Sequence, residues 1–204
     1  MKVLLLNGSP HASGNTYEAL NEVATTLRQE GIEAEILHIG IRPVQGCIGC
    51  FGCKQTGRCM MNDALYNMFE AKIRECDGIV VGSPVYYAGP NGSLCALLDR
   101  LFFASGRHLQ YKPAASVAVC RRGGASATFD RLNKYFTINN MPVVSSQYWN
   151  SVHGMTPGQA KEDGEGMQTM RTLARNMAWL LRKIASDAAP LPKAEEPIAT
   201  NFIR

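Results

Sequence analysis

The sequence has no long hydrophobic run. None of its 204 residues lies in a stretch that approaches the roughly 18 apolar residues needed by a membrane-spanning helix. The apolar run Val3 to Leu6 is also far shorter than the roughly 7 to 15 residues of a signal-peptide core. We therefore expect a cytoplasmic protein with no membrane partner.

Charged residues are also scarce. Asp, Glu, Lys and Arg make up 19% of the chain, below the globular average of about 25%, while 46% of residues are hydrophobic. This balance excludes a disordered chain and suits one folded domain. The net charge is +4, and the basic residues are scattered rather than gathered in a stripe. We therefore expect no nucleic-acid partner.

The first glycine-rich loop lacks two common nucleotide-binding signatures. GSPHASGNT, residues 8–16, has neither a Gly-Lys-Ser/Thr ending nor the G-x-G-x-x-G spacing. Its small and hydroxyl residues precede a predicted helix, whose N-terminal N–H groups can hold a phosphate. Without a Lys-Thr pair to position magnesium, a monophosphate fits better than a triphosphate. The alternative is a turn in which Ser13 or Asn15 only caps the helix.

Short apolar runs alternate with segments of helical periodicity along the chain. Strands that are apolar on both faces and alternate with helices are typical of a parallel sheet covered on both sides. We predict a flavodoxin-like doubly wound α/β fold with a five-stranded parallel sheet and helices on both faces. The predicted strands are 2–6, 33–39, 79–81, 114–120 and 142–145, and the predicted helices are 16–31, 62–75, 93–103, 126–138 and 164–186.

The predicted domain covers residues 1–186 and leaves a tail, 187–204. Three prolines, Pro190, Pro192 and Pro197, predict that this tail is extended. It is either a disordered end or an arm across a neighbouring subunit, and Phe202 with Ile203 slightly favours the arm.

Two further loops lie at the sheet edge where doubly wound folds bind ligands. In the loop 82–91, the adjacent Tyr86 and Tyr87 offer a flat wall for an aromatic ligand, although such tyrosines can equally serve packing or an interface. In the loop 121–125, glycines allow close approach of the backbone, and Arg121 can stabilise negative charge on a reduced ring.

Seven cysteines are present, although a cytosolic chain has no use for a disulfide framework. Cys76, Cys95 and Cys120 are dispersed in apolar surroundings and are predicted to behave as small buried hydrophobes. The other four form a C-x2-C-x2-C-x5-C array, and four thiolates on a compact loop suit an iron-sulfur cube. Zinc and a loop of free or oxidised thiols are the alternatives. The candidate metal ligands are Cys47, Cys50, Cys53 and Cys59.

Three motifs in order, GSPHASGNT, GSPVYYAGP with the following LLDR, and RRGG, resemble the flavodoxin-like NADPH-dependent FMN reductase superfamily. The resemblance spans about residues 1–186. It implies that the first loop holds the FMN phosphate and that the other two flank the isoalloxazine ring. By position, the phosphate residues are Ser9, His11, Asn15 and Thr16, and the ring residues are Pro84, Val85, Tyr86, Tyr87, Arg121, Gly123 and Gly124.

The cysteine spacing resembles the iron-sulfur flavoprotein branch, whose members bind a [4Fe-4S] cluster beside FMN. This resemblance implies an oxidoreductase in which the flavin performs the chemistry, so no catalytic side chain is assigned. Electrons would pass between FMN, the cluster and an external partner such as a ferredoxin, with NAD(P)H as a candidate donor, in a homodimer or homotetramer. Two alternatives stay open: a cluster-free NAD(P)H-dependent FMN or quinone reductase, and a non-enzymatic flavodoxin-like carrier or flavin-binding regulator.

The remaining polar candidates have no clear role in the sequence. His38, His108 and His153 have no recognisable partner, and we expect them at the surface or at the edge of the core. The segment Tyr148-Trp149-Asn150 follows the predicted fifth strand, where it could cover a flavin or form an oligomer contact.

Overall fold

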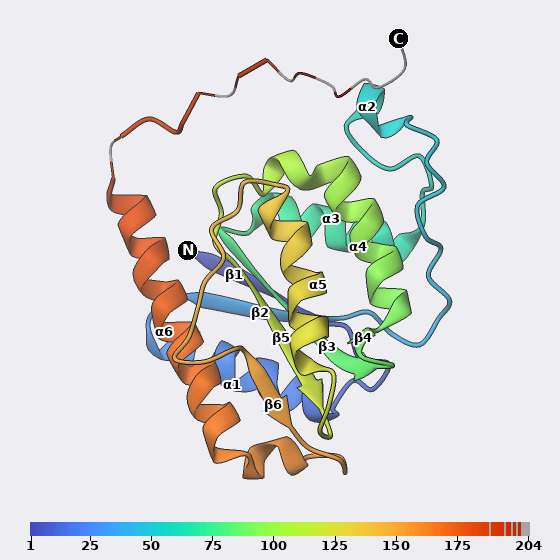
Figure 1. The fold of residues 1–204 in the computed structure, drawn as a ribbon. Helices are drawn as coiled ribbons and strands as arrows, with labels where there is room; N and C mark the ends of the chain where they lie inside the picture. The colour runs from blue at the N-terminus through green and yellow to red at the C-terminus, as the bar shows by residue number, and fades with distance from the viewer. Residues whose placement is uncertain (188, 194, 197, 199, 201–204) are drawn as a thin grey trace.

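The sheet is parallel and has helices on both faces (Figure 1). The computed structural model describes residues 1–187, 189–193, 195, 196, 198 and 200. Its strands follow the order β2-β1-β3-β5-β6, and every neighbouring pair on this path is parallel. This is the flavodoxin-like order, so the predicted fold class is confirmed. The strands are β1 Lys2–Asn7, β2 Glu33–His38, β3 Gly78–Tyr86, β4 Gly89–Pro90, β5 Ala114–Cys120 and β6 Ser151–His153.

Two hydrophobic clusters hold the helices to the sheet. Successive residues of a strand point to opposite faces, so Val3 and Leu5 pack with α1 and α6 while Leu4 and Leu6 pack with α3, α4 and α5. All four side chains are fully buried, which explains the unbroken apolar run of β1. The helices are α1 Asn15–Gln29, α2 Cys53–Thr56, α3 Ala64–Glu75, α4 Gly92–Ser105, α5 Ala125–Thr137 and α6 Gly164–Ser186.

β3 is longer than the predicted strand 79–81, and the prediction that Gly82-Ser83-Pro84 ends it is wrong. Ser83 and Pro84 pair with Ala118 and Val119 of β5, and the strand then folds back onto β4 as a hairpin. A proline lacks only one backbone donor, so it can continue the strand where that donor is not needed. The longer strand carries Val85 and Tyr86 past the sheet edge.

The predicted fifth strand, 142–145, is also wrong in position. Val143 forms only an isolated bridge with Ala114, and the strand of this edge is β6, beside Ala118 to Cys120. Ser151 follows Val143 by eight positions, whereas their partners Ala114 and Ala118 are only four positions apart. The surplus residues leave the sheet, so the edge strand is interrupted.

The described residues of the tail form neither helix nor strand. The Tyr111 hydroxyl lies 3.4 Å from the Pro192 carbonyl oxygen, to which it donates. The arm prediction depended on Phe202 and Ile203, which lie outside the described residues. In the part of the chain that the structure describes, no helix has the length and apolar character to cross a membrane.

Candidate functional site

A cavity of about 530 Å³ lies at the carboxyl edge of the sheet, between the loops that follow β1, β3, β5 and β6. Its volume is in the range of small-molecule sites. The fold brings together eight predicted residues in its lining: Ser9, His11, Asn15, Thr16, Pro84, Val85, Tyr86 and Arg121. The predicted residues Tyr87, Gly123 and Gly124 are not in that lining. The lining also contains Cys120, Gly154, Met155 and Pro157, which the sequence did not assign to this site.

The N-terminus of α1 opens into this cavity. Gly14 is its N-cap residue, and none of the described side chains accepts a capping hydrogen bond there. The interpretation of Ser13 or Asn15 as a simple cap is therefore wrong. An uncapped helix start has first-turn N–H groups without intrahelical partners, and the positive end of its dipole favours an anion.

Two polar side chains, the buried Asn7 and the half-buried His38, hold the first loop in shape. Asn7 is fully buried, accepts from the Ser9 N–H at 3.1 Å and donates to the Ala12 carbonyl at 3.3 Å. His38 Nε2 lies 2.7 Å from the Ser9 carbonyl oxygen, which can only accept, so Nε2 carries the proton. The sequence did not reveal this partner, and His38 is half-buried at the edge of the core, as expected. Asn7 and His38 are paired across β1 and β2, which motif spacing alone does not reveal.

The Asn15 side chain joins the first loop to the opposite wall of the cavity. Its Nδ2 donates to the Thr156 carbonyl at 3.0 Å, and its Oδ1 accepts from the Ala160 N–H at 3.1 Å. The segment it holds supplies Gly154, Met155 and Pro157 to the cavity lining. Asn15 therefore positions this wall through its amide, which leaves its backbone N–H at the helix start.

A strained hairpin forms another part of the rim. Tyr87 and Ala88 connect β3 to β4 with φ of +49° and +57°, in the left-handed region that non-glycine residues rarely adopt. The Tyr87 side chain is fully exposed. Gly124 has φ +87°, and a Cβ there would lie 2.7 Å from Ala88 Cα and 2.8 Å from Val85 Cγ1. Gly124 therefore packs directly against the hairpin, and its lack of a side chain allows this close approach.

Gly124→Ala should weaken flavin binding several-fold, because the new methyl group pushes the hairpin away. The same contact and the unfavourable φ should lower the free energy of unfolding by about 1–3 kcal/mol. Titration of the apoprotein with FMN and urea unfolding would measure the two effects. Gly123→Ala is the matched control, since nothing lies within 4 Å of a Cβ there. Equal behaviour of the two variants would contradict the supporting role of Gly124.

His153 and Asp163 form a pair beside this cavity. The Asp163 carboxylate accepts from the backbone N–H of His153 at 2.7 Å, and His153 Nδ1 lies 3.3 Å from it. The same carboxylate caps α6 by accepting from the Gly166 N–H at 2.9 Å. Burial opposes ionisation of Asp163, but these N–H groups outweigh it and lower its pKa. His153 therefore has a partner that the sequence did not reveal, and it is exposed, as expected. Both residues line a cavity of about 430 Å³ that also contains Arg121.

The segment Tyr148-Trp149-Asn150, which directly precedes β6, does not cover the cavity. The Tyr148 and Trp149 rings are exposed, with centroids 5.0 Å apart, and neither residue is in the lining. Asn150 is buried, and its side-chain amide has no hydrogen-bond partner among the described residues.

The four clustered cysteines line a second cavity, near the C-terminal end of α4. Arg100, Phe103 and Ala104 of that helix line the same cavity. Cys47 and Cys50 are exposed, whereas Cys53 and Cys59 are half-buried. Arg100 Nε donates to Cys59 Sγ at 3.4 Å. Among the described residues, no three His, Cys, Asp or Glu side chains are arranged as a ready metal site. The donor set nevertheless fits a group that takes four thiolates, because all four cysteines belong to the lining of the same cavity.

The three dispersed cysteines are separate from this segment. Cys76 and Cys120 are buried and Cys95 is half-buried, which confirms the packing prediction for the first two. Burial raises the pKa of the Cys76 thiol to about 11.

The cavity at the sheet edge and the cavity lined by the four cysteines share no lining residue. α4 begins just after β4, with Asn91 as its N-cap, and reaches the cysteines through Arg100 and Phe103. At about 1.5 Å per residue, the eleven positions between Gly92 and Phe103 span roughly 17 Å. The two sites can therefore be altered independently.

Comparison with known proteins shows the family of this chain. Residues 1–156 match the model of the family described as NADPH-dependent FMN reductase. The chain belongs to this family. An iron-sulfur flavoprotein of Methanocaldococcus jannaschii is 34% identical over 90% of this chain and 99% of its own length. An iron-sulfur flavoprotein of Methanosarcina thermophila is 29% identical over 90% of this chain and 97% of its own.

Solved structures show the same fold at low sequence identity. RosB has a TM-score of 0.71 at 16% identity, with 100% of this chain and 96% of that chain covered. A flavodoxin from the domain Archaea has a TM-score of 0.61 at 14% identity, with 89% and 99% covered. Membership of the FMN reductase family confirms the predicted FMN-dependent oxidoreductase function.

Proposed function

We propose that this FMN-dependent oxidoreductase also holds a [4Fe-4S] cluster on the loop 47–59 and passes electrons between FMN, the cluster and an external partner. The observation that carries the proposal is the convergence of Cys47, Cys50, Cys53 and Cys59 on one cavity. Four thiolates in C-x2-C-x2-C-x5-C spacing are the ligand set of a cube. The iron-sulfur flavoprotein names of the two relatives above also support it.

The flavin would take the cavity at the sheet edge, with its phosphate at the N-terminus of α1. The uncapped first turn supports this orientation, because its N–H groups and helix dipole favour an anion there. Pro84, Val85 and Tyr86 would form a wall beside the ring, and Arg121 would place positive charge near it. When bound, FMN supplies the hydride and electron transfer, so the protein only binds, orients and tunes it.

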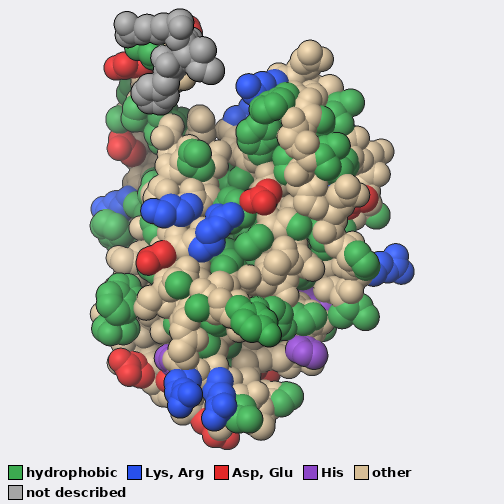
Figure 2. Space-filling view, turned by 45° about the vertical axis from the view of Figure 1, so that its right-hand side comes forward, with side chains coloured by type: hydrophobic (Ala, Val, Ile, Leu, Met, Phe, Trp, Pro, Cys, Tyr) green, Lys and Arg blue, Asp and Glu red, His purple; other side chains and the backbone are tan. Residues whose placement is uncertain are grey.

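The surface around the cysteine loop suits a redox protein as partner. Ile48, Phe51 and Phe103 are large exposed hydrophobic side chains. The ammonium group of Lys54 lies 4.9 Å from the Phe51 ring centroid, so positive charge borders the apolar surface. Figure 2 shows hydrophobic side chains gathered on this upper part of the molecule, with basic side chains beside them. An acidic partner such as a ferredoxin would complement this surface, which adjoins the proposed cluster.

Other electron donors and the assembly state remain part of the proposal. NADPH or NADH would reduce the bound FMN through the open side of the cavity. A homodimer or homotetramer is proposed because Tyr148, Trp149 and Trp179 leave large aromatic surfaces exposed on the single chain.

The flavin orientation predicts a strong preference for FMN over riboflavin. Riboflavin lacks the phosphate, so its Kd for the apoprotein should be at least about tenfold higher, in line with the strength of charge-assisted hydrogen bonds. Fluorescence titration of flavin-free protein with both compounds measures this ratio. Equal affinities would show that the first loop does not hold the phosphate. Stopped-flow reduction by NADPH and NADH then tests the proposed donors, and failure of both to reduce the flavin would exclude them.

A further inference from the structure

Arg100 is the largest fully buried side chain among the described residues. It projects from α4, and 1% of its surface is exposed. A guanidinium stays charged at any physiological pH, and a buried charge is costly unless it is paired and hydrogen-bonded. Its contacts therefore indicate why the chain retains a cation at this position.

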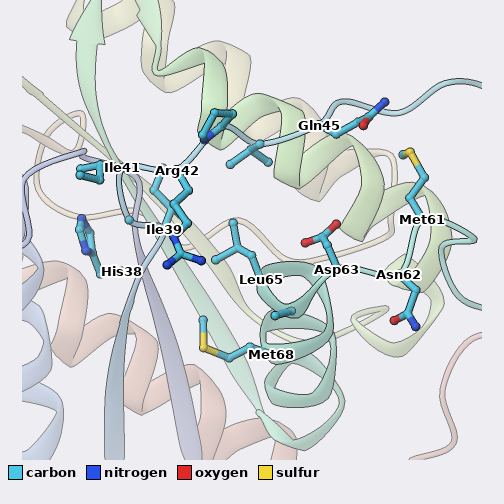
Figure 3. Close-up of a pocket in the computed structure, with 14 residues that line it drawn as sticks. His38, Ile39, Ile41, Arg42, Gln45, Met61, Asn62, Asp63, Leu65 and Met68 are labelled. Carbon is cyan, nitrogen blue, oxygen red and sulfur yellow. The ribbon is translucent and has the colours of Figure 1, made fainter.

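The guanidinium ties together the two ends of the cysteine segment. Nη1 lies 3.4 Å from the Gln45 carbonyl oxygen, just before Cys47, and Nη2 lies 2.6 Å from the Met61 carbonyl oxygen, just after Cys59. Figure 3 shows Gln45 on one chain segment and Met61 with Asp63 on another, around a cavity of about 820 Å³. One side chain thus closes the base of the loop that bears all four clustered cysteines.

The same side chain acts directly on a proposed ligand. Nε donates to Cys59 Sγ at 3.4 Å, while the Cys59 N–H donates to the Tyr66 hydroxyl at 3.2 Å. The guanidinium carbon of Arg100 lies 4.8 Å from the Tyr66 ring centroid, which fixes the orientation of its fork. Cys59 is therefore held through both its backbone and its sulfur.

The positive charge of Arg100 is only partly compensated by its neighbours, so an additional anion beside it would be favourable. The carboxylate paired with Arg100 belongs to Asp63, whose Oδ2 lies 2.5 Å from Nη2 and whose side chain is 47% exposed. That carboxylate also caps α3 by accepting from the Tyr66 N–H at 2.9 Å. Solvent screens a half-exposed carboxylate, so it compensates a buried cation only in part. Thiolates bound to iron would supply further negative charge on the Cys59 side.

The geometry points to Arg100 as the positioning residue of the cysteine loop: it fixes the ends of the loop before metal binds and raises the reduction potential of the bound cluster. The second part rests on the proposed function. Cys47, Cys50, Cys53 and Cys59 would hold the cluster, which would accept one electron from the reductant of the titration described below. The added negative charge is stabilised by a buried cation that donates to a ligand sulfur. Without Arg100 the potential should become more negative.

Two variants separate charge from geometry. Arg100→Lys keeps the positive charge but loses the planar fork that reaches Gln45, Met61 and Cys59 together, whereas Arg100→Met loses both at similar length. Arg131→Met is the control, because Arg131 lies on α5, is half-exposed and pairs with the neighbouring Asp99. Circular dichroism and FMN content identify any variant that fails to fold. If Arg100→Met does fail, Arg100→Lys still provides the comparison.

The first measurement is hydrogen exchange of the segment 45–61 in iron-free protein. Both Arg100 variants should exchange there at least about tenfold faster than wild type, the effect of losing roughly 1.4 kcal/mol of local stability, and Arg131→Met should not. The second is a reductive titration of the reconstituted proteins followed by electron paramagnetic resonance. Arg100→Met should shift the potential downward by at least about 59 mV, which is tenfold for a one-electron couple. Arg100→Lys should fall between Arg100→Met and wild type.

The outcomes distinguish this inference from the proposed function. If wild-type protein binds no iron, the proposed function fails, and the exchange measurement alone decides whether Arg100 closes the loop. If wild type holds the cluster but the Arg100 variants have the same cluster reduction potential as Arg131→Met, the effect of Arg100 on the cluster is refuted. Unchanged exchange in both Arg100 variants refutes the closure of the loop.

Discussion

Replacement of Cys50 by Ala should remove the iron from the protein and leave its FMN in place. Cys50 is one of four thiols that line the cysteine cavity, and a cube ligated by only three thiolates loses one corner of its support. The flavin cavity shares no residue with that cavity, so the variant should bind FMN with wild-type affinity. Iron, acid-labile sulfide and FMN are assayed after anaerobic purification of the variant and wild type.

Cys95→Ala is the control for this result. Cys95 is half-buried on α4 and lies outside the cysteine cavity, so its loss should leave both iron and FMN unchanged. Full iron content in Cys50→Ala would refute the ligand assignment. Parallel loss of iron and FMN in that variant would refute the independence of the two sites.

Replacement of Asn15 by Leu should raise the Kd for FMN by roughly 100-fold. The substitution removes the hydrogen bonds to the Thr156 carbonyl and the Ala160 N–H, so the segment that carries Gly154 and Met155 loses its anchor on the first loop. The hydrogen bond to Thr156 is exposed and the one to Ala160 is partly buried. At up to about 1.5 kcal/mol each, they give about 3 kcal/mol, which corresponds to that factor. Titration of the flavin-free variant by fluorescence measures it.

Asn176→Leu provides the comparison. Asn176 lies on α6, and its Nδ2 also donates to a main-chain carbonyl, that of Ser145, at 2.8 Å, but it lines no part of the flavin cavity. It should retain wild-type FMN affinity. If Asn15→Leu binds FMN as tightly as this control, Asn15 does not position the cavity wall.

Local patterns in the sequence predicted the elements that are buried and periodic. β1 reads as an apolar run because both of its faces are covered, and α6 begins and ends at the predicted residues because its periodicity is regular and Asp163 caps it. Motif order then placed eight predicted residues in one cavity. These features depend on neighbours along the chain, which a sequence displays directly.

The features that the sequence did not predict depend on partners far apart in the chain. The edge strand is interrupted because Ser151 to His153, rather than the predicted 142–145, completes the pairing with β5. His38 reaches Ser9 only because β2 lies beside β1, and the role of Gly124 requires the hairpin that β3 forms with β4. Arg100 is the last residue of the LLDR segment in the second motif, but its burial and its contact with Cys59 depend on the fold.

The most direct test of the account is the cofactor content of the protein after strictly anaerobic purification. One FMN, about four irons and about four sulfides per chain are predicted, together with a paramagnetic signal that appears on reduction and is lost in Cys50→Ala. FMN without iron would contradict the cluster and select the cluster-free reductase. Zinc in place of iron would contradict it equally, and a protein without flavin would overturn the account as a whole.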